Sequence, residues 1–294
     1  MGETVIGFIG LGVMGEPMCR NLRERGGYRV LAFDRDPAPV QRLAGAGVEA
    51  AASTGALVRA SDVVLVSLPS GQVLEQLARD ADGLLDNLRP GQMLVDLGTS
   101  PVALTRELAA ACMRRGARYL DAPVARTRAA AEAGTLSVMV GGDAEAFADI
   151  EPLLACIASE ITHCGAVGAG QLTKILNNMV LFETVAALSE ACAVATASGM
   201  DPVRLLETLS KGSADSFALR HHGLKAIAPQ RFPLRAFSVE YARKDLAYAI
   251  ELATQAGIDA EGAQRVDRLF ARAIAAGLGD QYFPVVSRLV RADR

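Results

Sequence analysis

TVIGFIGLGVMG (4–15) is the stretch of sequence that decides the fold of this chain. Residues 4–9 are typical of a buried strand, and a helical pattern begins directly after the following G-x-G-x-x-G turn. In such a turn the first glycine permits a tight bend, the second lets a ligand approach the backbone, and the third allows close packing of the helix on the strand. The free N–H groups at the helix start attract phosphate. The stretch therefore predicts a dinucleotide site with contacts at Gly10, Leu11, Gly12, Val13 and Met14.

An acidic residue after the second strand pattern agrees with this prediction. RVLAF (29–33) is followed by Asp34, at the position from which a carboxylate binds the ribose hydroxyls of adenosine. A carboxylate there repels the 2′-phosphate of NADP and so favours NAD. Arg35 could stack on the adenine or attract that phosphate, so NADP stays an alternative. Without a ligand, Asp34 would only cap the helix that Pro37 helps to begin.

Apolar strand patterns and helical patterns alternate through the first half of the chain. Strands are predicted at 4–9, 29–33, 62–68, 93–97, 118–124, 136–142 and 160–165, with helices near 14–25, 37–44, 71–79 and 101–115. After Gly170 only helical spacing remains, and one long helix over about 168–198 is predicted to join the halves. We therefore expect an α/β protein, with a Rossmann-type doubly wound parallel sheet over 1–164 and an all-helical domain over 165–294.

Composition excludes several classes of function. The net charge of −3 gives no electrostatic reason to expect a nucleic-acid partner. The five cysteines form no CxxC pair and no metal-ligand spacing, which favours a reducing compartment. The N-terminus does not resemble a signal peptide. Residues 179–200 are strongly apolar but carry Glu183 and Glu190, so we expect a buried helix rather than a membrane span. A cytoplasmic protein without metal, nucleic acid or membrane partner is expected.

Five blocks resemble, in the same order, the β-hydroxyacid dehydrogenase family, which includes 3-hydroxyisobutyrate dehydrogenase. They are GFIGLGVMGEPMCRNL (7–22), SLPS (67–70), DLGTSP (96–101), GAVGAGQLTKILNN (165–178) and ARKDLAYA (242–249). The resemblance implies a Rossmann domain, a helical domain and a cleft between them. It also implies hydride transfer between NAD(P) and a small β-hydroxy acid or its semialdehyde. Carried over by residue, it implies Lys174 as the catalytic lysine, Asn178 as its partner in holding substrate, and cofactor contacts at Leu68, Pro69, Thr99 and Lys244.

The reaction needs a group that accepts the hydroxyl proton as the hydride leaves. Zinc could assist, but the sequence offers no ligand cluster, and we expect His163, His221 and His222 to be structural or exposed. Lys174 lies in the apolar stretch QLTKILNNMVLF, where desolvation favours the neutral amine. Asn178 lies four residues on and shares its helix face. The alternative is a lysine that reaches solvent from an amphipathic helix.

The substrate turn departs from the family pattern. Where the family has a Ser-Gly-Gly turn after Asp-Ala-Pro-Val, this chain has Ala125-Arg126-Thr127 after DAPV (121–124). Arg126 could replace the lost contacts with a charge-assisted grip on an anionic substrate, and Thr127 could add a hydroxyl. The run resembles the turn of the sulfolactaldehyde reductase branch, whose substrate carries a sulfonate. Alternatively, Arg126 points outward into a surface ion pair, a role expected more of Arg128.

Two other functions fit the same motifs. Imine reductases resemble this scaffold but generally lack the lysine at position 174. A catalytically silent dinucleotide-binding module would leave Lys174, Asn178 and Lys244 idle. The apolar helical half also predicts a homodimer or homotetramer, an expectation that rests largely on the family resemblance.

Overall fold

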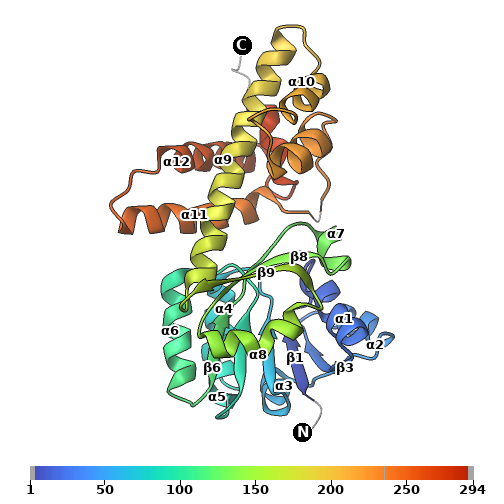
Figure 1. Cartoon of the computed structure of the whole chain (residues 1–294), viewed down its shortest axis with the longest axis vertical. Coiled ribbons are helices and arrows are strands. Elements are labelled where there is room, and N and C mark those ends of the chain that lie inside the picture. Colours follow the sequence, from blue (N-terminus) through green and yellow to red (C-terminus); the bar gives the residue numbers. More distant parts are fainter. Residues whose placement is uncertain (1–3, 235, 291–294) are drawn as a thin grey trace. The chain divides into compact units, whose positions relative to one another are not determined.

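A nine-stranded sheet forms the centre of the first of two units, Met1–Lys174 and Ile175–Arg294, into which the chain divides (Figure 1). The structure is a computed structural model and describes residues 4–234 and 236–290. The boundary between the units falls inside helix α9 (Ala169–Ala197), further along the chain than residue 164. It lies there because the first turn of α9 is bonded to loops of the sheet in unit 1.

Six neighbouring strands of the sheet run parallel. The order is β3-β2-β1-β4-β5-β6-β8-β7, with β9 paired to β8. The parallel strands are β1 (Val5–Ile9), β2 (Arg29–Phe33), β3 (Glu49–Ala50), β4 (Val63–Val66), β5 (Met93–Asp96) and β6 (Arg118–Asp121). From β1 the chain adds strands on one side of the sheet as far as β3, and it then returns to the other side of β1 and adds strands there from β4 onward. The pair β1 and β4 is therefore the switch point, where doubly wound sheets bind their ligands.

The far edge of the sheet differs from the sequence-based expectation. The single strand predicted over 118–124 is two strands, β6 and β7 (Val124–Ala125), because Pro123 lacks the N–H that a continuous ladder needs. Both strands pair antiparallel with β8 (Leu136–Gly141), while β9 (Ala158–Gly165) runs parallel to β8. The sheet is therefore mixed, and only its larger part is parallel.

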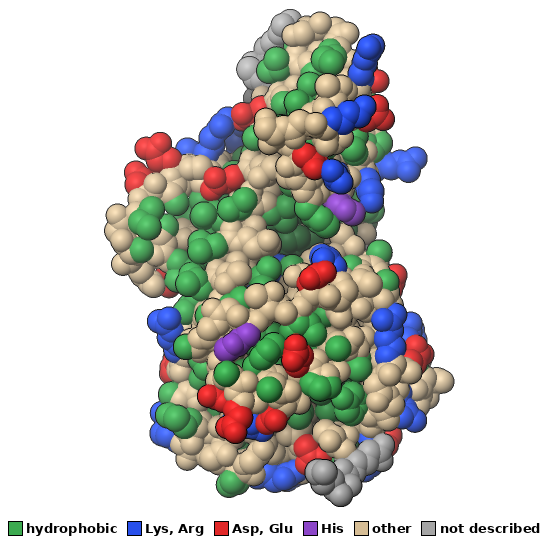
Figure 2. All heavy atoms as spheres, in the orientation of Figure 1, with side chains coloured by type: hydrophobic (Ala, Val, Ile, Leu, Met, Phe, Trp, Pro, Cys, Tyr) green, Lys and Arg blue, Asp and Glu red, His purple; other side chains and the backbone are tan. Residues whose placement is uncertain are grey.

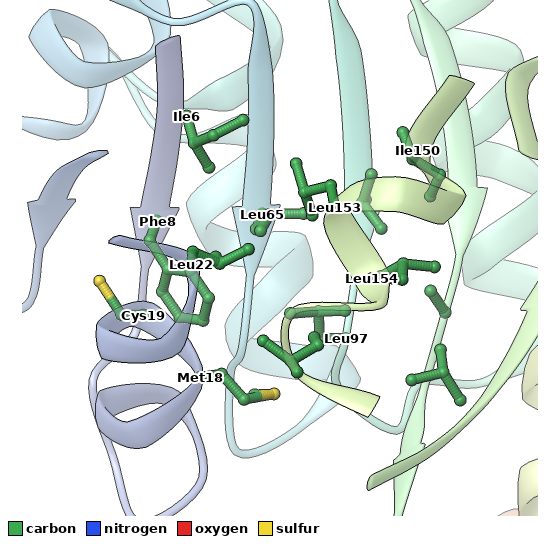
Figure 3. Packing of buried hydrophobic residues seen from close by; sticks show 14 of the residues in the cluster. Ile6, Phe8, Met18, Cys19, Leu22, Leu65, Leu97, Ile150, Leu153 and Leu154 are labelled. Atoms are coloured by element: carbon green, nitrogen blue, oxygen red, sulfur yellow. The ribbon is translucent and has the colours of Figure 1, made fainter. Parts of the chain in front are cut away.

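Helices cover both faces of this sheet (Figure 1). Alternate residues of one strand enter different cores, since Leu65 joins one cluster while Val64 and Val66 join the other. Figure 3 shows the first cluster, where Phe8 and Leu65 meet side chains of α1 (Gly15–Gly26) and α8 (Ala144–Leu154). The other helices are α2 (Pro37–Ala44), α3 (Thr54–Ala60), α4 (Gly71–Arg79), α5 (Leu84–Asn87), α6 (Val102–Met113) and α7 (Arg128–Glu132).

The second unit is helical, as predicted. After α9 come α10 (Pro202–Leu209), the π-helix η1 (Leu219–Ile227), α11 (Val239–Gln255), α12 (Glu261–Ala275) and the 3₁₀-helix η2 (Phe283–Leu289). Its core centres on Phe182 of α9, whose ring meets Phe270 and Phe283 edge-on at centroid distances of 5.4 and 5.1 Å. Such edge contacts are a favoured aromatic geometry.

Helix α9 buries one of its faces. Lys174, Asn178, Phe182, Val185 and Cys192 recur at helical spacing and are buried, whereas Val180 and Val194 are exposed. By length and composition alone α9 could cross a membrane, and a third of its most apolar window is buried. The helix that was predicted to be buried is therefore buried along one side only, and apolar side chains are exposed on its other side.

Candidate cofactor and substrate site

The predicted cofactor residues of unit 1 follow the carboxyl ends of neighbouring parallel strands. The glycine turn follows β1, Asp34 follows β2, Leu68 and Pro69 follow β4, and Thr99 follows β5. Because parallel strands end at the same edge of a sheet, these residues come together around the switch point between β1 and β4. That edge is where α/β sheets of this kind bind dinucleotides.

The glycine turn has the geometry that a bound pyrophosphate requires. Gly10 has φ +91°, and a Cβ there would lie 2.3 Å from the Ser67 carbonyl oxygen. A Cβ on Gly15 would lie 2.0 Å from the Gly10 carbonyl oxygen. The close approach of α1 to the end of β1 therefore requires glycine at this position. A Cβ on Gly12 would meet nothing within 4 Å. Gly12 thus faces open space beside the start of α1, which has no side-chain cap.

Asp34 is fixed against this turn. Its Oδ2 accepts the N–H of Leu11 at 2.5 Å, and its Oδ1 accepts the N–H of Asp36 at 2.9 Å. The alternative that Asp34 caps the next helix is wrong, because Asp36 is the residue that caps α2, through the N–H of Ala38. The Asp34 carboxylate is therefore held beside the glycine turn, where it fits the adenosine ribose of a dinucleotide.

The turn after β5 is braced by two buried side chains that sequence reasoning missed. Asp96 accepts the N–H of Gly98 at 2.9 Å and the hydroxyl of Ser100 at 2.8 Å. Gln171 of α9 accepts the N–H of Ser100 at 3.0 Å and donates to the Gly98 carbonyl at 2.8 Å. Thr99, the predicted cofactor contact, lies between the two residues that Gln171 bonds.

A third buried side chain, Asp121, holds the start of α9. It accepts the N–H groups of Gly168 at 2.7 Å and Gln171 at 2.8 Å. Burial raises the pKa of this carboxyl, and the bound N–H groups oppose the rise. A Cβ on Gly170 would lie 2.3 Å from the Met139 carbonyl oxygen, so the close approach of α9 to β8 requires glycine there. Asp121 and Gln171 thus set where the helix of Lys174 begins.

Lys174 and Asn178 lie one turn apart on α9, and both side chains are buried. Within unit 2, the Asn178 amide donates to Oδ2 of Asp245 on α11 at 2.8 Å. Oδ1 of Asp245 lies 2.8 Å from Nζ of Lys244, the predicted cofactor contact, which also lies over the ring of Tyr241. Asp245 therefore joins Asn178 to Lys244. Sequence reasoning missed it, although the acidic residue inside the Lys-Asp-Leu block was a visible signal.

The Ala125-Arg126-Thr127 turn has the backbone of a glycine turn although it contains no glycine. Arg126 has φ +86°, a region that glycine adopts far more easily than other residues. Its guanidinium donates to the Thr135 carbonyl at 2.7 Å and the Ser159 hydroxyl at 3.0 Å. The surface ion pair belongs to Arg128, which pairs with Glu132 at 2.8 Å. Thr127 caps α7 by accepting the N–H of Ala130.

His163 and His222 each have a hydrogen-bonding partner within their own unit. Nε2 of His163 lies 2.9 Å from the Gly142 carbonyl oxygen, and its ring stacks on Phe147. His222 is buried against Tyr282, and desolvation, with a smaller contribution from His221, lowers its pKa to about 4. Within residues 4–234 and 236–290, no three His, Cys, Asp or Glu side chains are grouped so as to hold a metal ion.

The doubly wound sheet and its glycine turn define a dinucleotide-binding protein with a helical second unit, and comparison with known proteins identifies its family. The family model of the NAD binding domain of 6-phosphogluconate dehydrogenase matches residues 5–165. A second model, described as NAD-binding of NADP-dependent 3-hydroxyisobutyrate dehydrogenase, matches residues 168–290.

Three relatives illustrate the match. The chain is 33% identical to 2-(hydroxymethyl)glutarate dehydrogenase of Eubacterium barkeri, over 97% of this chain and 94% of that protein. It is 36% identical to NAD-dependent L-serine dehydrogenase of Pseudomonas aeruginosa, over 97% of each. The structure of Mycobacterium tuberculosis 3-hydroxyisobutyrate dehydrogenase with L-serine matches at a TM-score of 0.89 and 32% identity, covering 99% of this chain and all of that one.

The chain belongs to the β-hydroxyacid dehydrogenase family. It is an NAD(P)-dependent oxidoreductase that acts on the hydroxyl group of hydroxy acids.

Proposed function

We propose that this protein interconverts a small anionic β-hydroxy acid and its semialdehyde, with Lys174 as the general acid and base. The named relatives act on 2-(hydroxymethyl)glutarate, L-serine and 3-hydroxyisobutyrate. In each compound the hydroxyl is on the carbon β to a carboxylate. That shared arrangement of hydroxyl and anion is the substrate class we infer.

The observation that carries the proposal is the burial of the Lys174 side chain on α9. Bound NAD(P) would supply the hydride acceptor, held by the glycine turn, Asp34 and the Thr99 turn. As the hydride leaves the carbinol carbon, the neutral Lys174 amine takes the hydroxyl proton, and in the reverse direction the ammonium returns it. Asn178, oriented by Asp245, offers its amide to the substrate oxygen atoms.

The acidic group of the substrate is assigned to the Ala125-Arg126-Thr127 turn. A guanidinium can bond a carboxylate or a sulfonate through two parallel N–H groups. A guanidinium in this turn therefore favours a carboxylate or sulfonate substrate with its negative charge near the hydroxyl. A sulfolactaldehyde-type reductase is therefore the second candidate, on the same site and by the same chemistry.

NAD is the cofactor that we expect to be preferred. The Asp34 carboxylate beside the glycine turn would repel a 2′-phosphate. Arg35 follows it directly and is the residue that could accommodate NADP instead. The ratio of kcat/KM for the two cofactors measures this preference.

The test is turnover of NAD and NADP with hydroxyisobutyrate, serine, glycerate, 4-hydroxybutyrate and dihydroxypropanesulfonate. Lys174→Ala should lower kcat by roughly a hundredfold or more, the usual contribution of a general base. The matched control is Lys211→Ala, since Lys211 is an exposed lysine of the same chain. Undiminished turnover by Lys174→Ala would refute the assigned role. Cofactor binding without turnover of any acid would indicate the silent binding module instead.

A further inference from the structure

Four buried polar side chains of unit 1 form one connected group that the proposed chemistry does not use directly. Asp96, Ser100, Asp121 and Gln171 are each at most 1% exposed. We name this group the α9 anchor. It joins the carboxyl ends of β5 and β6 to the first turn of α9. Polar groups buried this deeply are costly unless every member is bonded, so the arrangement fixes one geometry of these segments.

The backbone of α9 is held by Asp121. A helix leaves its first N–H groups without intrahelical partners, and a side chain at the cap position usually satisfies them. Here the partner comes instead from a distant strand, because Asp121 at the end of β6 accepts the N–H groups of both Gly168 and Gln171. The carboxylate also lies at the positive end of the helix dipole. The start of α9 is therefore fixed to the sheet.

The side chain of Gln171 forms hydrogen bonds to the turn that contains Thr99. Its Oε1 accepts from the backbone of Ser100, and its Nε2 donates to the Gly98 carbonyl and, at 3.2 Å, to Asp96. One amide thus bonds the residues on both sides of Thr99. Only a side chain that donates and accepts can do this, and glutamate could not donate to the two oxygens that Nε2 bonds.

We propose that Gln171 is a positioning residue, which fixes the distance and orientation of the Lys174 amine relative to the cofactor contact at Thr99. Lys174 lies three residues after Gln171 on the same rigid helix, so the anchor transmits its geometry to the amine. This inference rests on the proposed role of Lys174. Reactions at enclosed sites are sensitive to placement, and a displacement of about 1 Å costs on the order of a hundredfold in rate.

The test is Gln171→Met, which keeps the size of the side chain and removes its hydrogen bonds, beside the exposed control Gln255→Met. Cofactor sites are counted by fluorescence titration with NADH, and kcat is expressed per site. Gln171→Met should lower kcat per site roughly 10–100-fold, a larger change than in the Kd for NADH. Gln171→Glu should be at least as impaired, because its carboxylate would face Asp96.

A purely structural role for Gln171 would reduce the number of NADH sites and leave kcat per site within about twofold of the wild type, and that result would overturn the proposal. If Gln171→Met does not fold, kcat per NADH site is measured for Gln171→Asn instead. Its shorter amide cannot reach both Gly98 and Ser100. Lys174→Ala is measured in parallel. Full turnover by that variant would refute the role of Lys174, whereas an inactive Lys174→Ala with a normal Gln171→Met refutes the positioning role alone.

Discussion

Arg126 adopts a left-handed backbone conformation in a turn where the family resemblance implies glycine. For a side chain with a Cβ this conformation costs about 1–2 kcal/mol. Strain of this kind persists at sites where the side chain has a task. In the structure the exposed guanidinium donates to the Thr135 carbonyl and the Ser159 hydroxyl, and these bonds fix its position.

Two substitutions of Arg126 separate strain from substrate binding. Arg126→Gly and Arg126→Ala should both raise KM for the anionic acid about tenfold, the loss of one charged contact worth about 1.4 kcal/mol. Arg126→Gly should also be about 1 kcal/mol more stable than Arg126→Ala, because it relieves the positive φ. Steady-state kinetics and urea unfolding measure the two effects, with Arg128→Ala as the control. An unchanged KM for every acid that is turned over would rule out the grip on the anion.

His222 should make the protein less stable at mildly acidic pH. Burial lowers its pKa to about 4, whereas an unfolded histidine titrates near 6.5. As pH falls from about 6.5 to 4, the unfolded chain binds a proton that the folded chain does not, so stability is present above this window and lost within it. The loss is up to about 3 kcal/mol. Urea unfolding of the wild type and His222→Phe over this range should show a steeper decline for the wild type, and parallel curves would contradict the assignment.

The site residues named from the sequence are those that lie in blocks shared with the family or that break its pattern. Lys174 was singled out by the family resemblance, with which its apolar helix agrees, and Arg126 by the departure of its turn from the glycines of the family pattern. Asp96, Asp121, Gln171 and Asp245 were missed. Each is a polar residue whose partner is distant in sequence, so its burial depends on tertiary contacts that no local pattern contains.

The β1–α1 element contains the two glycines whose roles the structure separates most clearly. Gly12 has open space where a Cβ would be, whereas a Cβ on Gly15 would collide with the Gly10 carbonyl. Gly12→Ala should therefore fold with unchanged thermal stability but bind NAD about tenfold or more weakly, because the methyl group occupies the approach of the pyrophosphate.

Gly15→Ala is the matched comparison. Its unfolding temperature should fall, whereas the affinity of its folded molecules for NAD should change little. Thermal unfolding and calorimetric titration with NAD measure both quantities. Equal NAD affinity of Gly12→Ala and the wild type would show that the phosphates bind elsewhere.

Strongly periodic elements were predictable, and short ones were not. The helix at 37–44 was predicted at its observed limits, and the strand at 29–33 likewise. The short helices α3, α5 and α7 and the two-residue strand β3 escaped prediction, because a few residues carry too little periodicity. Helix α8 is longer than these but was not predicted either. Its N-cap residue, Asp143, was a sequence signal for a helix start that was not used.

For the whole molecule, the α/β half and the helical half followed from the change in pattern after Gly170. The order of the strands did not follow from it. The pattern of apolar residues in a strand does not encode its direction, so the antiparallel pairing of β8 with β6 and β7 could not be predicted from it.

The helical unit exposes large apolar side chains, several of which are visible at the surface in Figure 2. The residues of unit 2 concerned are Leu176, Val180, Val194, Met200, Val203, Phe217, Leu234 and Ile258. Exposed apolar surface of this kind is often covered by a partner. We propose a homo-oligomer on this basis, and sedimentation equilibrium should give a multiple of the mass of one chain. A single-chain mass at micromolar concentration would contradict it.

The role of Lys174 is tested most directly by the first hydride transfer itself. Wild type and Lys174→Met, each preloaded with NAD to an occupancy confirmed by titration, are mixed rapidly with the best hydroxy acid of the panel, and formation of reduced nicotinamide is followed. We expect Lys174→Met to bind NAD as the wild type does and to form NADH at least about a hundredfold more slowly. Equal rate constants for the two proteins would contradict the account.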